Sequence, residues 1–107
     1  MAAMPKPVLT IKRIEHFGDA RDDKISTELN KTRREEAEFF SELKHLEIKF
    51  DFEKGTPFQN GDTFLVNAGQ ITHTGPLKEN VREGVYPYSV KAQGLGAGTD
   101  PQIIVTN

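Results

Sequence analysis

The clearest pattern in this chain is a strict alternation of apolar and charged residues near its middle. From Leu46 to Phe52 every even position is apolar and every odd position is charged. Because successive side chains of a strand point to opposite faces, this pattern predicts a β-strand with one face in the core and the other in water. Gly55-Thr56-Pro57 ends the strand, and Phe58 is expected to anchor the following loop.

The last stretch, residues 84–107, predicts an antiparallel hairpin. Two runs rich in β-branched and aromatic residues flank the Gly-rich segment Gly94–Gly98, which is typical of a loop longer than two residues. The spacing of two places these side chains on the inner face: Tyr86, Tyr88, Val90, Ile103 and Val105. The hairpin should therefore pack against the middle strand.

Other short strands are predicted before the hairpin. Residues 8–17 read as a strand with a bulge near Lys12–Arg13, because Ile14 breaks the alternation that precedes it. Thr63–Asn67 is a nearly continuous apolar run, which predicts a strand in the middle of the core. Residues 70–74 fit a strand or an extended loop, and residues 77–83 fit a loop or one helical turn.

One amphipathic helix is predicted over about Thr32–His45. Thr32 and Glu35 have the spacing of a capping box, in which each side chain bonds a free backbone N–H of the first turn. Apolar residues then recur at helical spacing, as a helix packed on a core requires: Ala37, Phe39, Phe40, Leu43 and Leu46. The charged residues 19–30 fit either a long loop or a frayed helix.

These elements together predict a mainly β protein, an antiparallel β-sandwich with one inserted amphipathic helix around Thr32–His45. The length of 107 residues suits a single domain, predicted to span 8–107. Residues 1–7 are expected to be a disordered N-terminus, because Pro5 and Pro7 block regular pairing there.

Charge and composition narrow the classes of function. Fourteen basic against sixteen acidic residues give a net charge of -2, which speaks against nucleic acid and anionic membranes as partners. No apolar run reaches the ~20 residues of a membrane span, and no secretory signal is visible, so a cytoplasmic location is expected. The chain has no cysteine, which excludes disulfides, thiolate metal sites and thiol nucleophiles.

Histidine offers the one route to a metal site. The chain has three histidines, His16, His45 and His73, and none lies at the close spacing that marks a ligand set. His16 and His73 could meet across strands, since each lies near a strand end, and a metal-binding protein or metalloenzyme is kept as an alternative. The favoured interpretation is surface or half-buried histidines, with no metal and no cofactor.

A second alternative is a weak single-stranded nucleic-acid binder. Tyr86 and Tyr88 could form a stacking platform beside the basic residues Lys12 and Arg13. Packing of the tyrosines in or near the core is favoured, because no basic groove accompanies them. No catalytic residue is predicted, and Asp100 is expected to accept backbone N–H bonds and fix the turn into the last strand.

The chain end carries a family resemblance. Tyr86-Pro87-Tyr88-Ser89-Val90 followed by Asp100-Pro101-Gln102-Ile103-Ile104-Val105 resembles the DP-EP family of small bacterial proteins of unknown function. The acidic residue and proline that follow the isoleucines in that family are replaced here by Val105-Thr106-Asn107. The resemblance implies an immunoglobulin- or cupredoxin-like sandwich, with no activity and no catalytic residues to transfer.

The function predicted is a non-catalytic binding or structural β-sandwich module, and an enzyme is less favoured. A protein is the expected kind of partner, although the sequence does not identify it. The chain is expected to be a monomer or a weak homo-oligomer.

Overall fold

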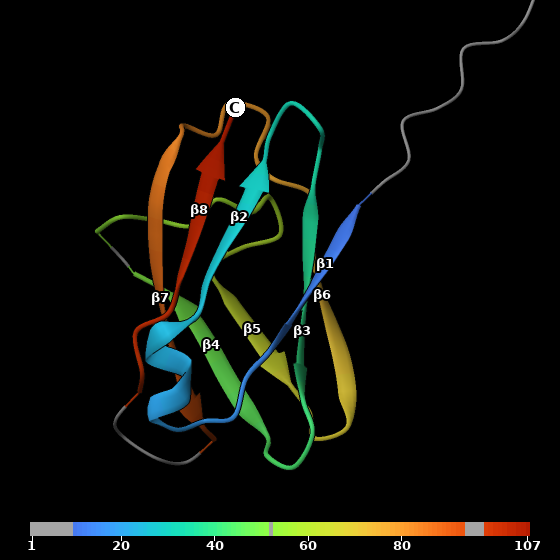
Figure 1. The fold of residues 1–107 in the computed structure, drawn as a ribbon, viewed down its shortest axis with the longest axis vertical. Helices are drawn as coiled ribbons and strands as arrows, with labels where there is room; N and C mark the ends of the chain where they lie inside the picture. The colour runs from blue at the N-terminus through green and yellow to red at the C-terminus, as the bar shows by residue number, and fades with distance from the viewer. Residues whose placement is uncertain (1–9, 52, 94–97) are drawn as a thin grey trace, which may run out of the picture.

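The computed structural model describes residues 10–51, 53–93 and 98–107, which form β-strands and one short 3-10 helix (Figure 1). The predicted disordered segment 1–7 lies outside these residues. The elements in chain order are β1 (Ile11–Glu15), η1 (Ala20–Lys24), β2 (Ser26–Asn30), β3 (Glu36–Ser41), β4 (Leu46–Phe50), β5 (Thr63–Val66), β6 (Gln70–Gly75), β7 (Gly84–Ala92) and β8 (Gln102–Thr106).

The strands form two sheets, so the prediction of a mainly β protein is confirmed. One sheet has the order β1-β3-β6 and the other the order β2-β8-β7-β4-β5. β1–β3 and β2–β8 are parallel, whereas the other neighbours are antiparallel. The sheets meet through the ring of Phe39 on β3, whose centroid lies 5.7 Å from those of Phe64 and Tyr88 on the larger sheet.

The alternating middle strand is confirmed as β4. Leu46, Ile48 and Phe50 are buried, while Glu47 and Lys49 face away from the core. Phe58 is fully buried, as expected of an anchor, and its ring centroid lies 5.5 Å from that of Phe50. The predicted inward position of residue 52 lies outside the described residues.

The C-terminal hairpin is also confirmed. β7 and β8 pair antiparallel, with Gly84 opposite Val105, and their buried side chains include Tyr88, Val90, Ile103 and Val105. Most of the predicted Gly-rich loop, residues 94–97, is outside the part of the chain that the structure describes.

The predicted helix over Thr32–His45 is wrong. Residues 31–34 form a turn, β3 follows, and no α-helix occurs in the described residues. Arg34 adopts a φ of 56°, and its N–H donates to the Lys31 carbonyl, which reverses the chain between β2 and β3. Within β3, Ala37, Phe39 and Ser41 point inward, which is the spacing of two residues that a strand requires. The segment follows this strand period rather than the helical spacing on which the prediction was based.

The segment before the turn is neither wholly loop nor frayed helix. Residues 20–24 form η1, and residues 26–30 form β2, which pairs parallel with β8. Leu29 is buried because it lies opposite Val105 on the inner face of the larger sheet. β2 therefore depends on a partner some 76 positions later in the chain, which local spacing could not reveal.

Two further details differ from prediction. β1 pairs continuously from Ile11 to Glu15 without a bulge at Lys12–Arg13, because Ile11 is simply exposed and Ile14 is the inward residue. The irregularity lies instead in β3, between Ala37 and Glu38. β5 is an edge strand rather than a central one, and its Leu65 is 56% exposed.

We predict that Phe50→Ala destabilises the fold by about 3–5 kcal/mol, because the ring is buried between Phe58 and Tyr88. Urea denaturation measures this change, with Leu65→Ala on the neighbouring edge strand as the exposed control, expected to cost less than about 1 kcal/mol. Equal losses in the two variants would contradict the placement of the core.

Candidate functional site

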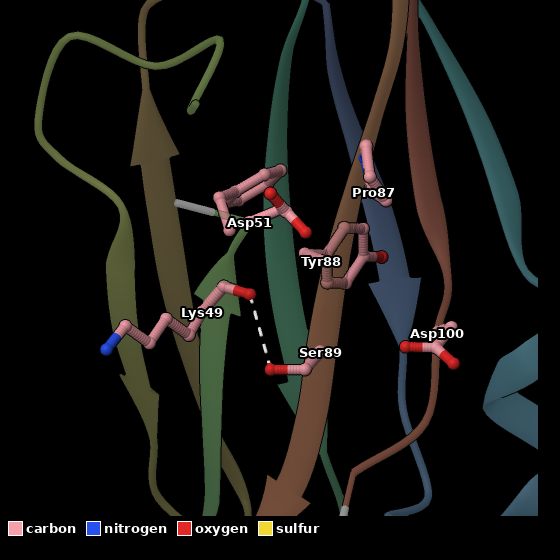
Figure 2. A pocket seen from close by; sticks show the side chains of 7 residues that line it. Lys49, Asp51, Pro87, Tyr88, Ser89 and Asp100 are labelled. Carbon is pink, nitrogen blue, oxygen red and sulfur yellow. Dashed lines mark hydrogen bonds between the residues drawn. The ribbon is translucent and has the colours of Figure 1, made fainter. Parts of the chain in front are cut away.

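An open hollow of about 240 Å³ lies on the outer face of the larger sheet (Figure 2). It is lined by Lys49, Phe50, Asp51, Pro87, Tyr88, Ser89 and Asp100. Its polar groups largely serve the protein itself. The Ser89 hydroxyl donates to the Lys49 carbonyl at 3.3 Å, and Asp51 Oδ1 accepts from the N–H groups of Glu53 and Lys54. The hollow thus holds charged side chains without a set that converges on a ligand.

Asp100 acts as a hydrogen-bond donor through its backbone, whereas the prediction made its carboxylate an acceptor. Its own N–H donates to Asp23 Oδ1 at 2.7 Å, so the aspartate of η1 fixes the entry to β8. Within the described residues no hydrogen bond engages the Asp100 carboxylate. The contact joins η1 to the hairpin across 77 positions of sequence.

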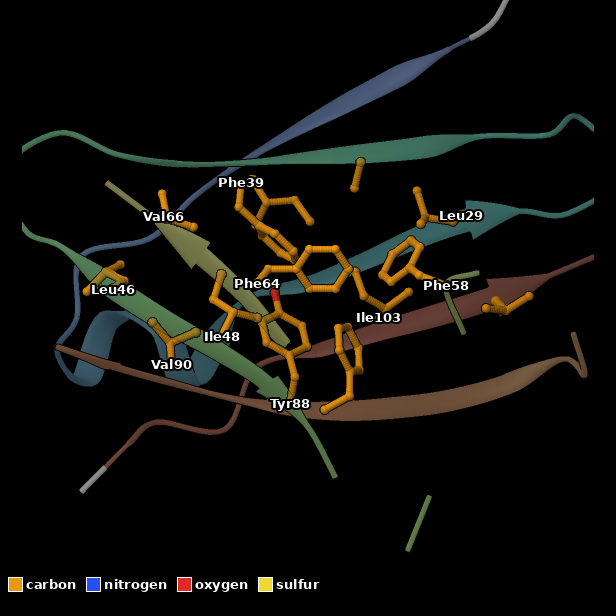
Figure 3. Close-up of a cluster of buried hydrophobic side chains, with 14 of the residues drawn as sticks. Leu29, Phe39, Leu46, Ile48, Phe58, Phe64, Val66, Tyr88, Val90 and Ile103 are labelled. Atoms are coloured by element: carbon orange, nitrogen blue, oxygen red, sulfur yellow. The ribbon is translucent and has the colours of Figure 1, made fainter. Parts of the chain in front are cut away.

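A second arrangement, a buried polar cluster, lies between the sheets. It consists of His16, which follows β1, Asp22 on η1 and Tyr88 on β7, and these residues are 1%, 0% and 2% exposed. Figure 3 shows the Tyr88 hydroxyl pointing into the core, away from β7. The imidazole Nε2 lies 2.9 Å from that hydroxyl, and Nδ1 lies 3.4 Å from Asp22 Oδ1.

The turn between β1 and η1 places the Asp22 carboxylate next to the His16 imidazole. The Asp22 carboxylate accepts the N–H groups of Phe17 at 2.9 Å and Gly18 at 2.8 Å. Gly18 has a φ of 72°, and a Cβ on it would lie 2.9 Å from Leu46 Cδ2, so glycine allows the sharp turn here. The turn after β1 therefore places the Asp22 carboxylate beside His16, and the same carboxylate stabilises that turn through its two backbone hydrogen bonds.

The protonation pattern of the cluster follows from burial. Burial raises the pKa of Tyr88, and the charge of Asp22 raises it further, so the phenol keeps its proton. The hydroxyl can then donate to His16 Nε2, which assigns the imidazole proton to Nδ1, on the side of Asp22. Nδ1 makes no well-aligned hydrogen bond, so its contact with the carboxylate is chiefly electrostatic.

His16 is held neutral by its surroundings. Burial lowers its pKa from the ordinary value of 6.5, and the Asp22 carboxylate offsets part of that effect. Aspartate, histidine and a hydroxyl are the residue types of acid–base catalysis, but catalysis needs contact with a substrate. All three side chains are buried, and the contact between His16 and Tyr88 joins the smaller sheet to the larger one.

The outer face of the three-stranded sheet is the third feature, called here the β1-β3-β6 face. Strand register and alternation assign it these residues: Ile11, Arg13, Glu15, Glu36, Glu38, Phe40, Ile71 and His73. Arg13 Nε donates to Glu38 Oε1 at 2.9 Å, and its guanidinium lies 5.4 Å from the Phe40 ring centroid. Apolar side chains remain on this face, since Ile11 and Ile71 are 40% and 39% exposed.

The structure does not bring His16 and His73 together. His16 points into the core, whereas the His73 side chain is 62% exposed and lies 3.7 Å from Glu38 Oε2. His45 is elsewhere, with Nδ1 accepting the Ala68 N–H. Within the described residues, no three histidine, aspartate or glutamate side chains gather as a metal site would require.

The four residues of the predicted nucleic-acid site, Tyr86, Tyr88, Lys12 and Arg13, do not lie together. Tyr88 is inside the core, and Tyr86 is half-buried with its hydroxyl donating to the Arg82 carbonyl at 2.7 Å. Lys12 points toward the larger sheet, where Nζ donates to the Glu28 carbonyl at 2.8 Å and lies 3.4 Å from Glu35. Arg13 lies on the opposite face of the same strand, so these four residues share no surface.

Sequence reasoning missed the role of Asp22. Its place in a charged run suggested solvent, and nothing in that run marks one carboxylate for burial. A signal did exist for His16, because it lies two positions after the buried Ile14 on the same face of the strand.

Comparison with family models, characterised proteins and solved structures found no match for this chain. None of the helical structure in residues 10–51, 53–93 and 98–107 is long and apolar enough to cross a membrane.

We predict that stability falls as the pH drops below about 6.5, because the unfolded chain then binds a proton at His16 that the folded state resists. The group contributes fully above that pH, and its loss can approach about 1.4 kcal/mol per pH unit. Urea denaturation between neutral pH and about pH 5 measures the slope. His16→Gln should flatten it, and His73→Gln should not; equal slopes in both variants would contradict the assignment.

Tyr88→Phe should cost about 1–3 kcal/mol of stability, since it removes the donor to His16 Nε2 while keeping the ring. Thermal or urea denaturation measures the loss. Tyr86→Phe is the matched control, expected to cost less because the Tyr86 hydroxyl bonds a carbonyl at the exposed side. A larger loss in the control would refute the stabilising role assigned to the buried Tyr88 hydroxyl.

Proposed function

We propose that this protein is a non-catalytic β-sandwich module that binds a protein partner through the β1-β3-β6 face. The observation that carries the proposal is the pairing of exposed apolar side chains with a stacked arginine on one regular surface. Solvent-facing sides of sheets are commonly polar, so binding would explain why Ile11, Phe40 and Ile71 lie together on this face.

The contact chemistry of this face supports protein binding. Aromatic residues and arginine are enriched in protein interfaces, and Arg13 and Phe40 already lie against each other. Arg13, Glu38 and His73 form a row across the three strands, with Glu38 in contact with both Arg13 and His73. Such a row gives a partner a fixed pattern of charges beside the apolar Phe40–Ile71 pair.

The sealed cluster supports the non-catalytic half of the proposal. The side chains of His16, Asp22 and Tyr88 are buried, and Tyr88 and Asp22 use their polar atoms on His16 and on the backbone of residues 17 and 18. The charged hollow on the other sheet is open, and its Ser89 hydroxyl and Asp51 carboxylate bond the protein's own backbone. A surface contact therefore fits this protein better than turnover of a substrate.

Within the sandwich class, we favour the cupredoxin-like version over the immunoglobulin-like one. Immunoglobulin sheets are antiparallel, whereas two of the pairs here, β1–β3 and β2–β8, are parallel. Membership of the DP-EP family stays a proposal. It rests on the sequence resemblance, whose two pieces lie side by side, with the Tyr88 N–H donating to the Pro101 carbonyl at 3.0 Å.

We predict that Ile71→Asp weakens partner binding without unfolding the protein, because it places a charge in the apolar part of the face. Immobilised wild-type protein, Ile71→Asp and Leu65→Asp are compared for proteins retained from a lysate of the source cells. Leu65 is the matched control, an exposed leucine on the other sheet. A partner should be retained by wild type and control, and weakened at least ~10-fold, about 1.4 kcal/mol, by Ile71→Asp.

Two results would contradict this proposal. One is a partner held equally by wild type and Ile71→Asp but lost with Leu65→Asp, which would move the site to the larger sheet. The other is a specific turnover activity in the purified protein that survives Ile71→Asp. Circular dichroism of each variant confirms that any loss is not caused by unfolding.

A further inference from the structure

The turn of residues 59–62 carries the one Asn-Gly step in the chain, Asn60-Gly61. Asn60 is exposed, and the turn lies against the end of β6. Its side-chain Nδ2 donates to the Thr74 carbonyl at 3.3 Å, and the neighbouring Gln59 N–H donates to the Pro76 carbonyl. The turn is thus attached to an edge strand of the smaller sheet.

The surroundings of Gly61 leave its backbone nitrogen accessible. A Cβ placed on Gly61 would meet nothing within 4 Å, so the space beside this peptide is open. The Gly61 carbonyl accepts from the Thr56 hydroxyl, whereas among the described residues no hydrogen bond engages the Gly61 N–H. Glycine also permits the backbone rearrangement that a side chain at this position would resist.

We infer that Asn60 is a site of spontaneous deamidation, a modification that loosens the turn from β6. The Gly61 nitrogen attacks Asn60 Cγ, so an N–Cγ bond forms, the Cγ–Nδ2 bond breaks, and ammonia leaves with the proton lost from Gly61. Water then opens the five-membered succinimide at either carbonyl, giving aspartate or isoaspartate. The net change is water consumed and ammonia released, and no oxidant, reductant or enzyme is needed.

Three other described asparagines provide contrasts within the same chain. Asn67 and Asn80 are exposed but precede Ala68 and Val81, whose Cβ atoms hinder the attacking nitrogen. Asn30 precedes Lys31, and its Oδ1 accepts the Arg33 N–H at 2.9 Å, which holds the amide in place. The restraint on Asn60 is weaker, because 3.3 Å is long for an N–H···O bond.

The product changes the contact with β6. An Asn60 amide donates to the Thr74 carbonyl, but a carboxylate has no hydrogen to donate and faces that oxygen as a second acceptor. Space is also tight, since the Asn60 amide packs directly over Gly75, which has a φ of 72°. Asp62 adds a further negative charge two residues along. Deamidation therefore replaces an attractive contact with a repulsive one.

The first test follows the modification itself. The folded protein is incubated at mildly alkaline pH and physiological temperature, digested, and each asparagine peptide is quantified by mass spectrometry with an isoaspartate assay. Asn60 should convert several-fold faster than Asn67 and Asn80, and its rate should rise with pH because the Gly61 nitrogen must lose a proton. Conversion of Asn60 no faster than that of Asn67 would overturn the inference.

The second test follows the consequence. Asn60→Asp should lower the melting temperature by several degrees, whereas Asn67→Asp, an equal charge change in another exposed turn, should leave it nearly unchanged. Asn60→Gln is the control for the chemistry, because its longer side chain would have to close a six-membered ring and should resist conversion. An unchanged melting temperature in Asn60→Asp would refute the proposed loosening of the turn.

Discussion

Tyr88 joins the two sheets by packing and by a hydrogen bond at the same point. Its ring centroid lies 5.7 Å from that of Phe39 on the smaller sheet and 5.0 Å from that of Phe50 on its own, so it packs against aromatic rings of both sheets. Its hydroxyl reaches His16, 2.9 Å away across the core. Without this bond, a buried phenol and a buried imidazole would each lack a partner, which costs more than the bond itself contributes.

The same contact fixes how the chain passes from one sheet to the other. β1 belongs to the smaller sheet and β2 to the larger, and His16 and η1 lie in the connection between them. Asp22 holds the connection through the N–H groups of residues 17 and 18, while Asp23 on the same turn holds the start of β8. The connection between β1 and β2 is thus fixed by the two aspartates of η1, one bonded to the residues after β1 and the other to the residue at the entry to β8.

Three of the edge strands have a side chain bonded to a backbone carbonyl. Lys12 bonds Glu28 on β2, Thr72 bonds Leu65 on β5, and Asn60 bonds Thr74 on β6. Covering the polar groups of edge strands reduces pairing with other chains. This protection favours the β1-β3-β6 face over a strand edge as the proposed binding surface, and it gives the Asn60 amide a structural role that the proposed deamidation would remove.

The sequence by itself determined the strands in which apolar and polar residues alternate along a short stretch. β4 and the β7–β8 hairpin were predictable because alternation is a property of neighbouring residues, and burial of one face follows from it. The spacing of Thr32 and Glu35 was equally local but ambiguous. The Glu35 carboxylate does reach back to a backbone N–H, that of Asn30, yet it closes a turn between strands rather than capping a helix.

Only the tertiary structure decided which partners the remaining residues would have. β2 became a strand because β8 lies beside it, and among the described residues β5 has β4 as its one partner in the larger sheet, which makes it an edge strand. The buried cluster joins His16 and Tyr88 across 72 positions, and Asp22 enters it through the turn at Gly18. Such contacts depend on where distant segments meet, and no short stretch of sequence contains that information.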